Sequence, residues 1–126
     1  MRTLIVEDHP DCSIALARLL RRMGHEVRAA ATAEEALRAC GEESFDLLIS
    51  DIGLPDMTGW ALLRRVRERC AVPAIALTAY GSPADEERSR AAGFQVHLSK
   101  PVDIAALKAA VSRFAGPAGT ALPPTA

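Results

Sequence analysis

Short apolar runs alternate with longer segments of helical period along this chain. The runs occupy residues 3–6, 26–30, 46–50, 74–77 and 95–98. Between them, apolar residues recur at three- or four-residue spacing, which is typical of an amphipathic helix. The spacing is clearest in three sets, namely Ile14, Ala15, Leu19 and Met23; Ala33, Ala36, Leu37 and Cys40; and Ile104, Leu107, Val111 and Phe114. The pattern therefore predicts five strands that alternate with five helices.

Residues that commonly begin or end helices lie between these segments. The predicted helix starts are Thr32, which forms a capping box with Glu35, Ser82 before Pro83, and Asp103 before Ile104. The predicted helix ends are the glycines Gly24, Gly41 and Gly93. These signals agree with the helical periods and support the alternating order.

Strands that are apolar on both faces and alternate with helices imply a parallel sheet that is covered on both sides. We therefore expect a three-layer α/β domain over residues 1–115. Residues 116–126, GPAGTALPPTA, have no apolar period and are rich in Ala and Pro. We expect them to be a flexible tail or a piece of linker.

Composition narrows the functional classes. The chain has 126 residues, enough for one domain, and its 15 basic and 16 acidic residues give a net charge of −1. A nucleic-acid-binding protein usually shows a basic excess, so we expect no direct contact with nucleic acid. No apolar run reaches the roughly 20 residues of a membrane span, and the N-terminus does not resemble a signal peptide. The expected location is the cytoplasm.

The three cysteines, Cys12, Cys40 and Cys70, are an odd number and lack the spacing of a metal site. Each falls in a segment of helical character. We expect them to be small thiols that fill the core.

Polar residues collect where the predicted strands end. Glu7 and Asp8 follow the first strand, and Asp51 follows the third within the sequence LLISDIGLPDMTGW. Thr78 ends the fourth strand, and Lys100 lies just past the fifth. In an open parallel sheet, ligands bind in the crevice at the carboxyl ends of the strands. These five side chains are expected to meet there.

The residue types indicate phosphoryl chemistry. Three neighbouring carboxylates repel one another and favour a bound cation, and oxygen ligands without nearby His or Cys favour Mg²⁺ over zinc. Mg²⁺, the Lys100 ammonium and the Thr78 hydroxyl together suit a phosphoryl group, because its transfer depends on positioning and on neutralising charge. Asp51 is the candidate nucleophile, since it ends a central strand and precedes a flexible loop.

This set of residues resembles the receiver domain of bacterial two-component response regulators, over about residues 2–114. The matching features are the acidic pair Glu7 and Asp8; Asp51 with Pro55 and Gly59 four and eight residues on; Thr78 followed by Ala79; and Lys100–Pro101. No single feature is specific, but the ordered set is. The sequence GFQVHLSKPVD is most similar to receivers of hybrid sensor kinases or to stand-alone relay receivers.

The resemblance implies a flavodoxin-like (βα)5 fold with strand order 2-1-3-4-5. It implies that Asp51 accepts a phosphoryl group from a histidine kinase or a histidine phosphotransfer protein. Asp8, Asp51 and the Gly53 carbonyl would bind Mg²⁺ directly, with Glu7 reaching it through water. Lys100 would contact the phosphoryl group, and the bond to Pro101 would be cis. The domain would catalyse only its own phosphorylation and dephosphorylation.

The resemblance also implies a switch and an output surface. Thr78 would move toward the phosphoryl group, and the residue at His97, often Tyr or Phe in the family, would swing inward after it. A downstream protein would bind the face formed by the fourth helix, fifth strand and fifth helix. Gly53 and Tyr80 flank the path of the attacking water in such domains, so we expect them to set the lifetime of the phosphoryl group.

Two alternatives stay open. One is a Mg²⁺-dependent phosphohydrolase that passes through an aspartyl phosphate, although the common haloacid dehalogenase-like form needs a second Asp where this chain has Gly53. The other is a degenerate receiver that acts only as a binding module, against which the intact Asp51, Thr78 and Lys100 argue.

Overall fold

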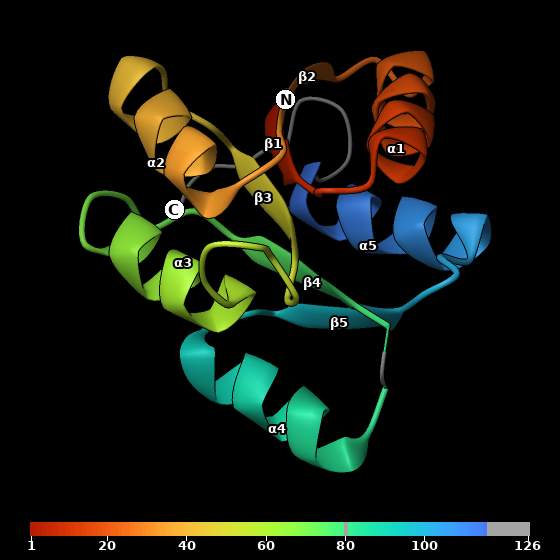
Figure 1. The fold of residues 1–126 in the computed structure, drawn as a ribbon. Helices are drawn as coiled ribbons and strands as arrows, with labels where there is room; N and C mark the ends of the chain where they lie inside the picture. Colours follow the sequence, from red (N-terminus) through yellow and green to blue (C-terminus); the bar gives the residue numbers. More distant parts are fainter. Residues whose placement is uncertain (80, 116–126) are drawn as a thin grey trace.

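A computed structural model describes residues 1–79 and 81–115, which form five strands and five helices in strict alternation (Figure 1). The elements are β1 (Arg2–Val6), α1 (Pro10–Arg22), β2 (Glu26–Ala30), α2 (Ala33–Glu42), β3 (Leu47–Asp51), α3 (Gly59–Arg67), β4 (Ala74–Thr78), α4 (Pro83–Ala92), β5 (Val96–Ser99) and α5 (Ile104–Ala115). The predicted tail, residues 116–126, lies outside the described residues.

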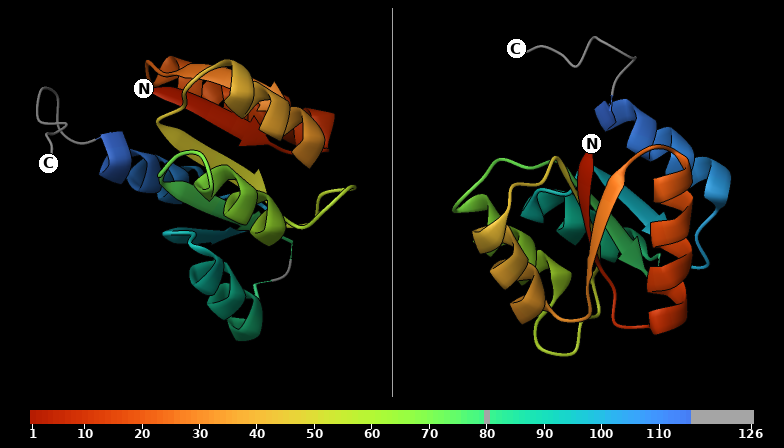
Figure 2. Two further views of the ribbon diagram at one scale, coloured as in Figure 1. Left: turned by 90° about the vertical axis from the view of Figure 1, so that its left-hand side faces the viewer. Right: turned by 90° about the horizontal axis from the view of Figure 1, so that it is seen from above.

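The five strands form one parallel sheet in the order β2-β1-β3-β4-β5. Helices α1 and α5 cover one face of the sheet, and α2, α3 and α4 cover the other (Figures 1 and 2). Each face has its own apolar core, built around Leu62, Leu63 and Val66 on the α3 side and around Leu20, Leu107 and Val111 on the α1–α5 side. The expected three-layer, flavodoxin-like fold is therefore confirmed.

Burial explains why the central strands read as continuous apolar runs. All five residues of β3 and all five of β4 are buried, because helices lie over both faces of these strands. The edge strand β5 is only half-buried along most of its length. None of the helices in the described residues is both long and apolar enough to cross a lipid bilayer.

The predicted helix starts are confirmed in their hydrogen bonds. The side chains of Thr32 and Ser82 accept hydrogen bonds from the backbone N–H three residues on, and Asp103 accepts one from Ala105. Gly93 closes α4 with φ of 114°, a left-handed conformation that favours glycine. The prediction for Gly41 is wrong, because α2 continues through it to Glu42.

The prediction that the cysteines fill the core is wrong. Cys12 and Cys70 are exposed and Cys40 is half-buried, so the thiols are not core-filling residues. Ile14 is 52% exposed, because α1 buries the neighbouring face that carries Leu16, Ala17 and Leu20. The apolar residues of α1 cover a wider stripe of the helix than the part that contacts the sheet. Their spacing alone did not show which of them face the sheet.

Helix α4 is held to its neighbour by polar contacts. Ser89 is its one buried residue, and the Ser89 hydroxyl accepts a hydrogen bond of 2.9 Å from the Trp60 indole on α3. The guanidinium of Arg88 lies 4.1 Å from the centre of the Trp60 ring. Trp60 therefore joins α3 to α4 rather than filling the core alone.

Candidate functional site

The five polar residues predicted at the strand ends do come together. Asp51 and Thr78 are the last residues of β3 and β4, Glu7 and Asp8 follow β1, and Lys100 follows β5. A pocket of about 440 Å³ at this edge is lined by His9, Cys12, Asp51, Gly53, Thr78, Ala79 and Lys100. The parallel sheet brings these residues to one place because all its strands end at the same edge.

Lys100 links the acidic residues of two strands. Its Nζ lies 2.7 Å from Glu7 Oε1 and 3.0 Å from Asp51 Oδ2, while its side chain is 18% exposed. Burial alone would lower the pKa of Lys100, but the hydrogen bonds and negative charges of Glu7 and Asp51 outweigh it, so the pKa is raised. The ammonium therefore stays charged through the physiological pH range.

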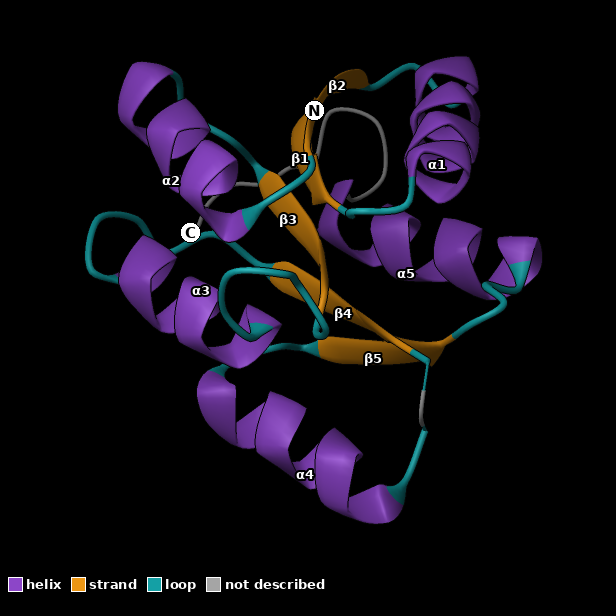
Figure 3. Cartoon of the chain, in the orientation of Figure 1, coloured by secondary structure: helices purple, strands orange, loops and turns teal. Residues whose placement is uncertain are grey.

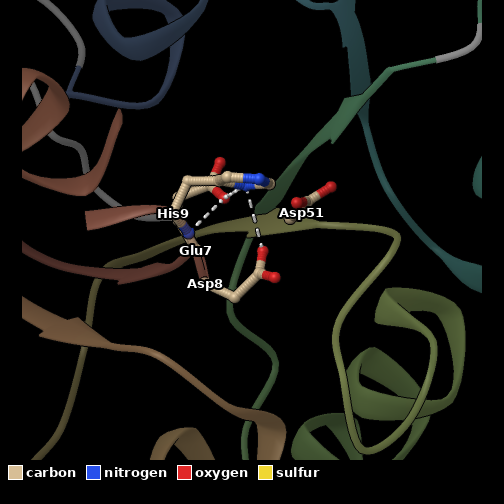
Figure 4. Close-up of side chains that lie close together, drawn as sticks. All are labelled: Glu7, Asp8, His9 and Asp51. Atoms are coloured by element: carbon tan, nitrogen blue, oxygen red, sulfur yellow. Dashed lines mark hydrogen bonds and ion pairs between the residues drawn. The ribbon is translucent and has the colours of Figure 1, made fainter. Parts of the chain in front are cut away.

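Three carboxylates and one imidazole form a cluster beside Lys100, namely Glu7, Asp8, Asp51 and His9 (Figure 4). One ligand atom from each lies within 4.8 Å of all the others. Asp8 Oδ1 is shielded from solvent and accepts no hydrogen bond within the described part of the chain. Such a buried oxygen is costly unless a cation or donor satisfies it. Carboxylate oxygens in this arrangement suit Mg²⁺.

Figure 3 shows the loop that connects β3 to α3, and hydrogen bonds of this loop orient the carboxylate of Asp51. The backbone N–H of Gly53 donates a hydrogen bond of 3.2 Å to Asp51 Oδ1, so Gly53 and Lys100 each hold one oxygen of this carboxylate. Gly53 also pairs with Thr58, which closes the loop on itself. At the helix start, the Gly59 N–H donates to the Ile52 carbonyl at 2.8 Å.

Gly59 is required by its close approach to this backbone. A Cβ at Gly59 would overlap the carbonyl oxygen of Asp51 and would lie 3.0 Å from the Cα of Ile52. The glycine that follows Asp51 by eight residues therefore lets α3 begin directly against the end of β3. At Gly53, by contrast, an added Cβ would meet nothing within 4 Å.

Asp56 lies in the loop between β3 and α3 and was not among the residues predicted from the sequence. Its two carboxylate oxygens accept hydrogen bonds from the backbone N–H groups of Ala33 and Glu34, at 3.0 and 2.9 Å. These donors lie in the first turn of α2, so Asp56 anchors the loop to the neighbouring helix. The bond from Ala33 contributes most to a lowered pKa at Asp56.

The expected switch residues lie on β4 and β5. The backbone N–H of Lys100 donates a hydrogen bond of 2.7 Å to the Thr78 carbonyl, and the Lys100–Pro101 bond is cis. His97 is half-buried on β5 opposite Ala76, and its Nε2 is buried without a hydrogen-bond partner among the described residues. Tyr80 lies outside the described residues.

His9 contradicts the expectation that no histidine lies near the oxygen ligands of the site. Its side chain is 70% exposed, but its Nδ1 lies 3.2 Å from Glu7 Oε2 and 3.4 Å from Asp8 Oδ1. The sequence contained the signal, because His9 directly follows the acidic pair. His25 is remote from this site, and its Nδ1 lies 3.1 Å from the N-terminal amine.

The geometry can be compared with known proteins. A family model described as the response regulator receiver domain matches residues 3–112. This chain belongs to the response regulator receiver family. A 14.6 kDa protein of Leptolyngbya boryana, described as uncharacterized, is 42% identical over 106 residues, which cover 82% of this receiver and 81% of that protein.

Solved receivers have the same fold. A CheY-like receiver domain protein from Methanospirillum hungatei is 34% identical, with a TM-score of 0.83 over 89% of this chain and 90% of that one. The Vibrio cholerae chemotaxis protein CheY4 is 30% identical, with a TM-score of 0.84 over 90% of this chain and 97% of that one. The family and the fold that the sequence predicted are both confirmed.

Larger sensor proteins contain a similar segment. The Escherichia coli sensor protein EvgS is 33% identical over 111 residues, which cover 87% of this receiver but 9% of EvgS. The sensor histidine kinase RcsC of Salmonella typhi is 31% identical over 91% of this receiver and 12% of RcsC. The chain thus spans about a tenth of the length of these two sensor proteins.

Proposed function

We propose that this receiver accepts a phosphoryl group on Asp51 and relays a two-component signal. The observation that carries the proposal is the position of the Asp51 carboxylate. It lies at the pocket with one oxygen 3.0 Å from the Lys100 ammonium and the other bound to the Gly53 N–H. A carboxylate held in this way keeps a fixed orientation toward an incoming phosphorus atom.

The phosphoryl donor is a phosphorylated histidine of a histidine kinase or a histidine phosphotransfer protein. In the transfer, the donor N–P bond breaks, an Asp51 O–P bond forms, and the imidazole leaves. One solved relative, 25% identical, is the receiver domain of yeast Ssk1 in a co-crystal with the histidine phosphotransfer protein Ypd1. Similarity to a receiver in such a complex supports a donor of the same class here.

Different residues of the pocket would stabilise the phosphoryl group by different interactions. Lys100 places a permanent positive charge beside the oxygens, and the Thr78 hydroxyl donates a hydrogen bond once the group is in place. Asp8, Asp51 and the Gly53 carbonyl would hold Mg²⁺, with Glu7 acting through water. When bound, Mg²⁺ neutralises negative charge on the transferring oxygens.

The output surface is the face formed by α4, β5 and α5. A hydrogen bond from Thr78 to the phosphoryl group would draw that side chain inward, and His97 would follow into the space it leaves. His97 suits this role because it lies on the half-buried strand β5 with a buried Nε2 that has no partner among the described residues. A downstream protein would then bind the altered face.

Incubation with acetyl phosphate and Mg²⁺, followed by intact-mass measurement, tests the proposal. We expect the mass of one phosphoryl group on the natural sequence and none on Asp51→Asn, which keeps the shape of the side chain but removes the nucleophile. Rapid hydrolysis of a foreign phosphoester would instead indicate a phosphohydrolase. No reaction at all would indicate a degenerate receiver.

A further inference from the structure

The cation site of this receiver contains a nitrogen donor as well as oxygen donors. Figure 4 shows the imidazole of His9 between the carboxylates of Glu7 and Asp8, with Asp51 facing it. The His9 side chain is 70% exposed and makes no cap for α1, and its Nδ1 is held at the carboxylates by a hydrogen bond of 3.2 Å to Glu7 Oε2. Its nitrogen faces the carboxylates rather than solvent.

The distance from the His9 nitrogen to the Asp8 oxygen is close to that between two neighbouring ligands of one metal ion. For bonds of about 2.1 Å, neighbouring ligands of an octahedral ion lie roughly 3.0 Å apart and those of a tetrahedral ion roughly 3.4 Å apart. His9 Nδ1 lies 3.4 Å from Asp8 Oδ1, while its 3.2 Å contact with Glu7 Oε2 is a hydrogen bond that a metal ion on this nitrogen would replace. One exposed ring rotation is enough to adjust these distances, whereas the buried carboxylate of Glu7 is fixed by Lys100.

The charges of the cluster favour a divalent ion. In their ionised forms, Glu7, Asp8 and Asp51 carry three negative charges and Lys100 one positive charge, which leaves an excess of two. A neutral imidazole adds a ligand without changing that balance. Asp8 Oδ1, which is shielded and accepts no hydrogen bond in the described residues, supplies an oxygen next to it.

The geometry points to His9 as a direct ligand that makes this site prefer divalent transition ions such as Ni²⁺ over Mg²⁺. Imidazole binds Ni²⁺, Cu²⁺ and Zn²⁺ well, whereas Mg²⁺ prefers oxygen and keeps several waters. Replacing His9 by a water should cost little binding free energy for Mg²⁺. The same replacement should cost much more for Ni²⁺, because Ni²⁺ binds imidazole well. This inference rests on the proposed function only in using the same cation site.

Calorimetric titration with Ni²⁺ and with Mg²⁺ tests the assignment. We expect His9→Ala and His9→Gln to weaken Ni²⁺ binding by about tenfold or more, since loss of even an indirect partner of a ligand costs that much. The affinity for Mg²⁺ should change by less than about threefold. Thermal unfolding of each variant would confirm that the fold is retained, as expected for an exposed side chain.

A variant at another histidine serves as the matched control. His25→Ala removes the imidazole beside the N-terminal amine, which is a competing chelate. This variant should keep its Ni²⁺ affinity within about threefold of the natural sequence, since larger losses are expected only when a ligand or its direct partner is removed. The assignment is overturned if His9→Ala binds Ni²⁺ as tightly as the natural sequence, or if Ni²⁺ and Mg²⁺ affinities fall equally.

The phosphorylation assay and this titration can fail independently. If acetyl phosphate leaves Asp51 unmodified while His9→Ala selectively loses Ni²⁺, the proposed function is wrong and the ligand assignment stands. If Asp51 is phosphorylated and His9→Ala keeps its Ni²⁺ affinity, the function stands and the ligand assignment is wrong.

Discussion

Replacement of Gly59 by alanine should both destabilise the domain and displace the phosphoacceptor. The new methyl would overlap the carbonyl oxygen of Asp51 and press on Ile52, and both obstacles are backbone atoms that cannot rotate away. Overpacking of this kind costs about 1–3 kcal/mol. Loss of glycine freedom in the unfolded chain offsets roughly 0.4–1 kcal/mol. The net loss should be about 1–2 kcal/mol.

Gly53→Ala is the matched control for this change. It adds the same methyl group to the same loop, but nothing lies within 4 Å of the added atom. Its stability should therefore equal or exceed that of the natural sequence by up to about 1 kcal/mol. The comparison separates steric overlap from the general effect of removing a glycine.

Thermal and urea unfolding measure the predicted difference. For a domain of this size, the net loss corresponds to a Tm lower by roughly 4–10 °C for Gly59→Ala. Acetyl phosphate labelling should also slow, because a shift of the β3 end moves the Asp51 carboxylate away from Lys100. If Gly59→Ala is as stable as Gly53→Ala and is labelled at the natural rate, the close approach does not constrain this site.

Three further predictions concern other residues of the site region. The lowered pKa of Asp56, caused chiefly by its bond from Ala33, means that its stabilisation is present above about pH 3.9 and is lost as pH falls through the folded-state pKa. Asp56→Asn should therefore unfold at a lower urea concentration than the natural sequence near neutral pH and at the same concentration in strong acid, as titrations at both pH values would reveal. Asp8→Asn should weaken Mg²⁺ binding more than Glu7→Gln, and equal losses by calorimetry would contradict the proposed direct role of Asp8. Beryllofluoride should shift the NMR resonances of β5, including His97; an unshifted His97 would mean that it takes no part in the switch.

The fold was predictable because its signals are local and repeated. Each of the central strands is apolar on both faces, and three helix starts carry capping residues whose hydrogen bonds form as expected. Gly41 failed as a helix end because a glycine only lowers helix stability locally, and Glu42, the next residue of α2, accepts a hydrogen bond of 2.8 Å from Arg28 of β2. At this position a tertiary contact outweighs the preference of glycine to end a helix.

The members of the site were predictable to the extent that they lie at strand ends. Position along a strand located Asp51, Thr78 and Lys100, since parallel strands end at one edge. Asp56 escaped notice because its partners are backbone N–H groups 22 and 23 residues away in sequence, which no local pattern reveals. His9 was not counted among the site residues, although it directly follows the acidic pair in the sequence.

The contacts of Trp60 with α4 should make the intrinsic tryptophan fluorescence of this receiver sensitive to the position of α4. The chain has one tryptophan, and its indole is bonded to Ser89 and stacked under Arg88 of α4. Because α4 buries one residue, it is the helix that should separate from the body most readily and show the fastest amide hydrogen exchange. Movement of α4 would change the polarity around the indole, so the emission of the natural sequence would report on the proposed output face in real time without an added label.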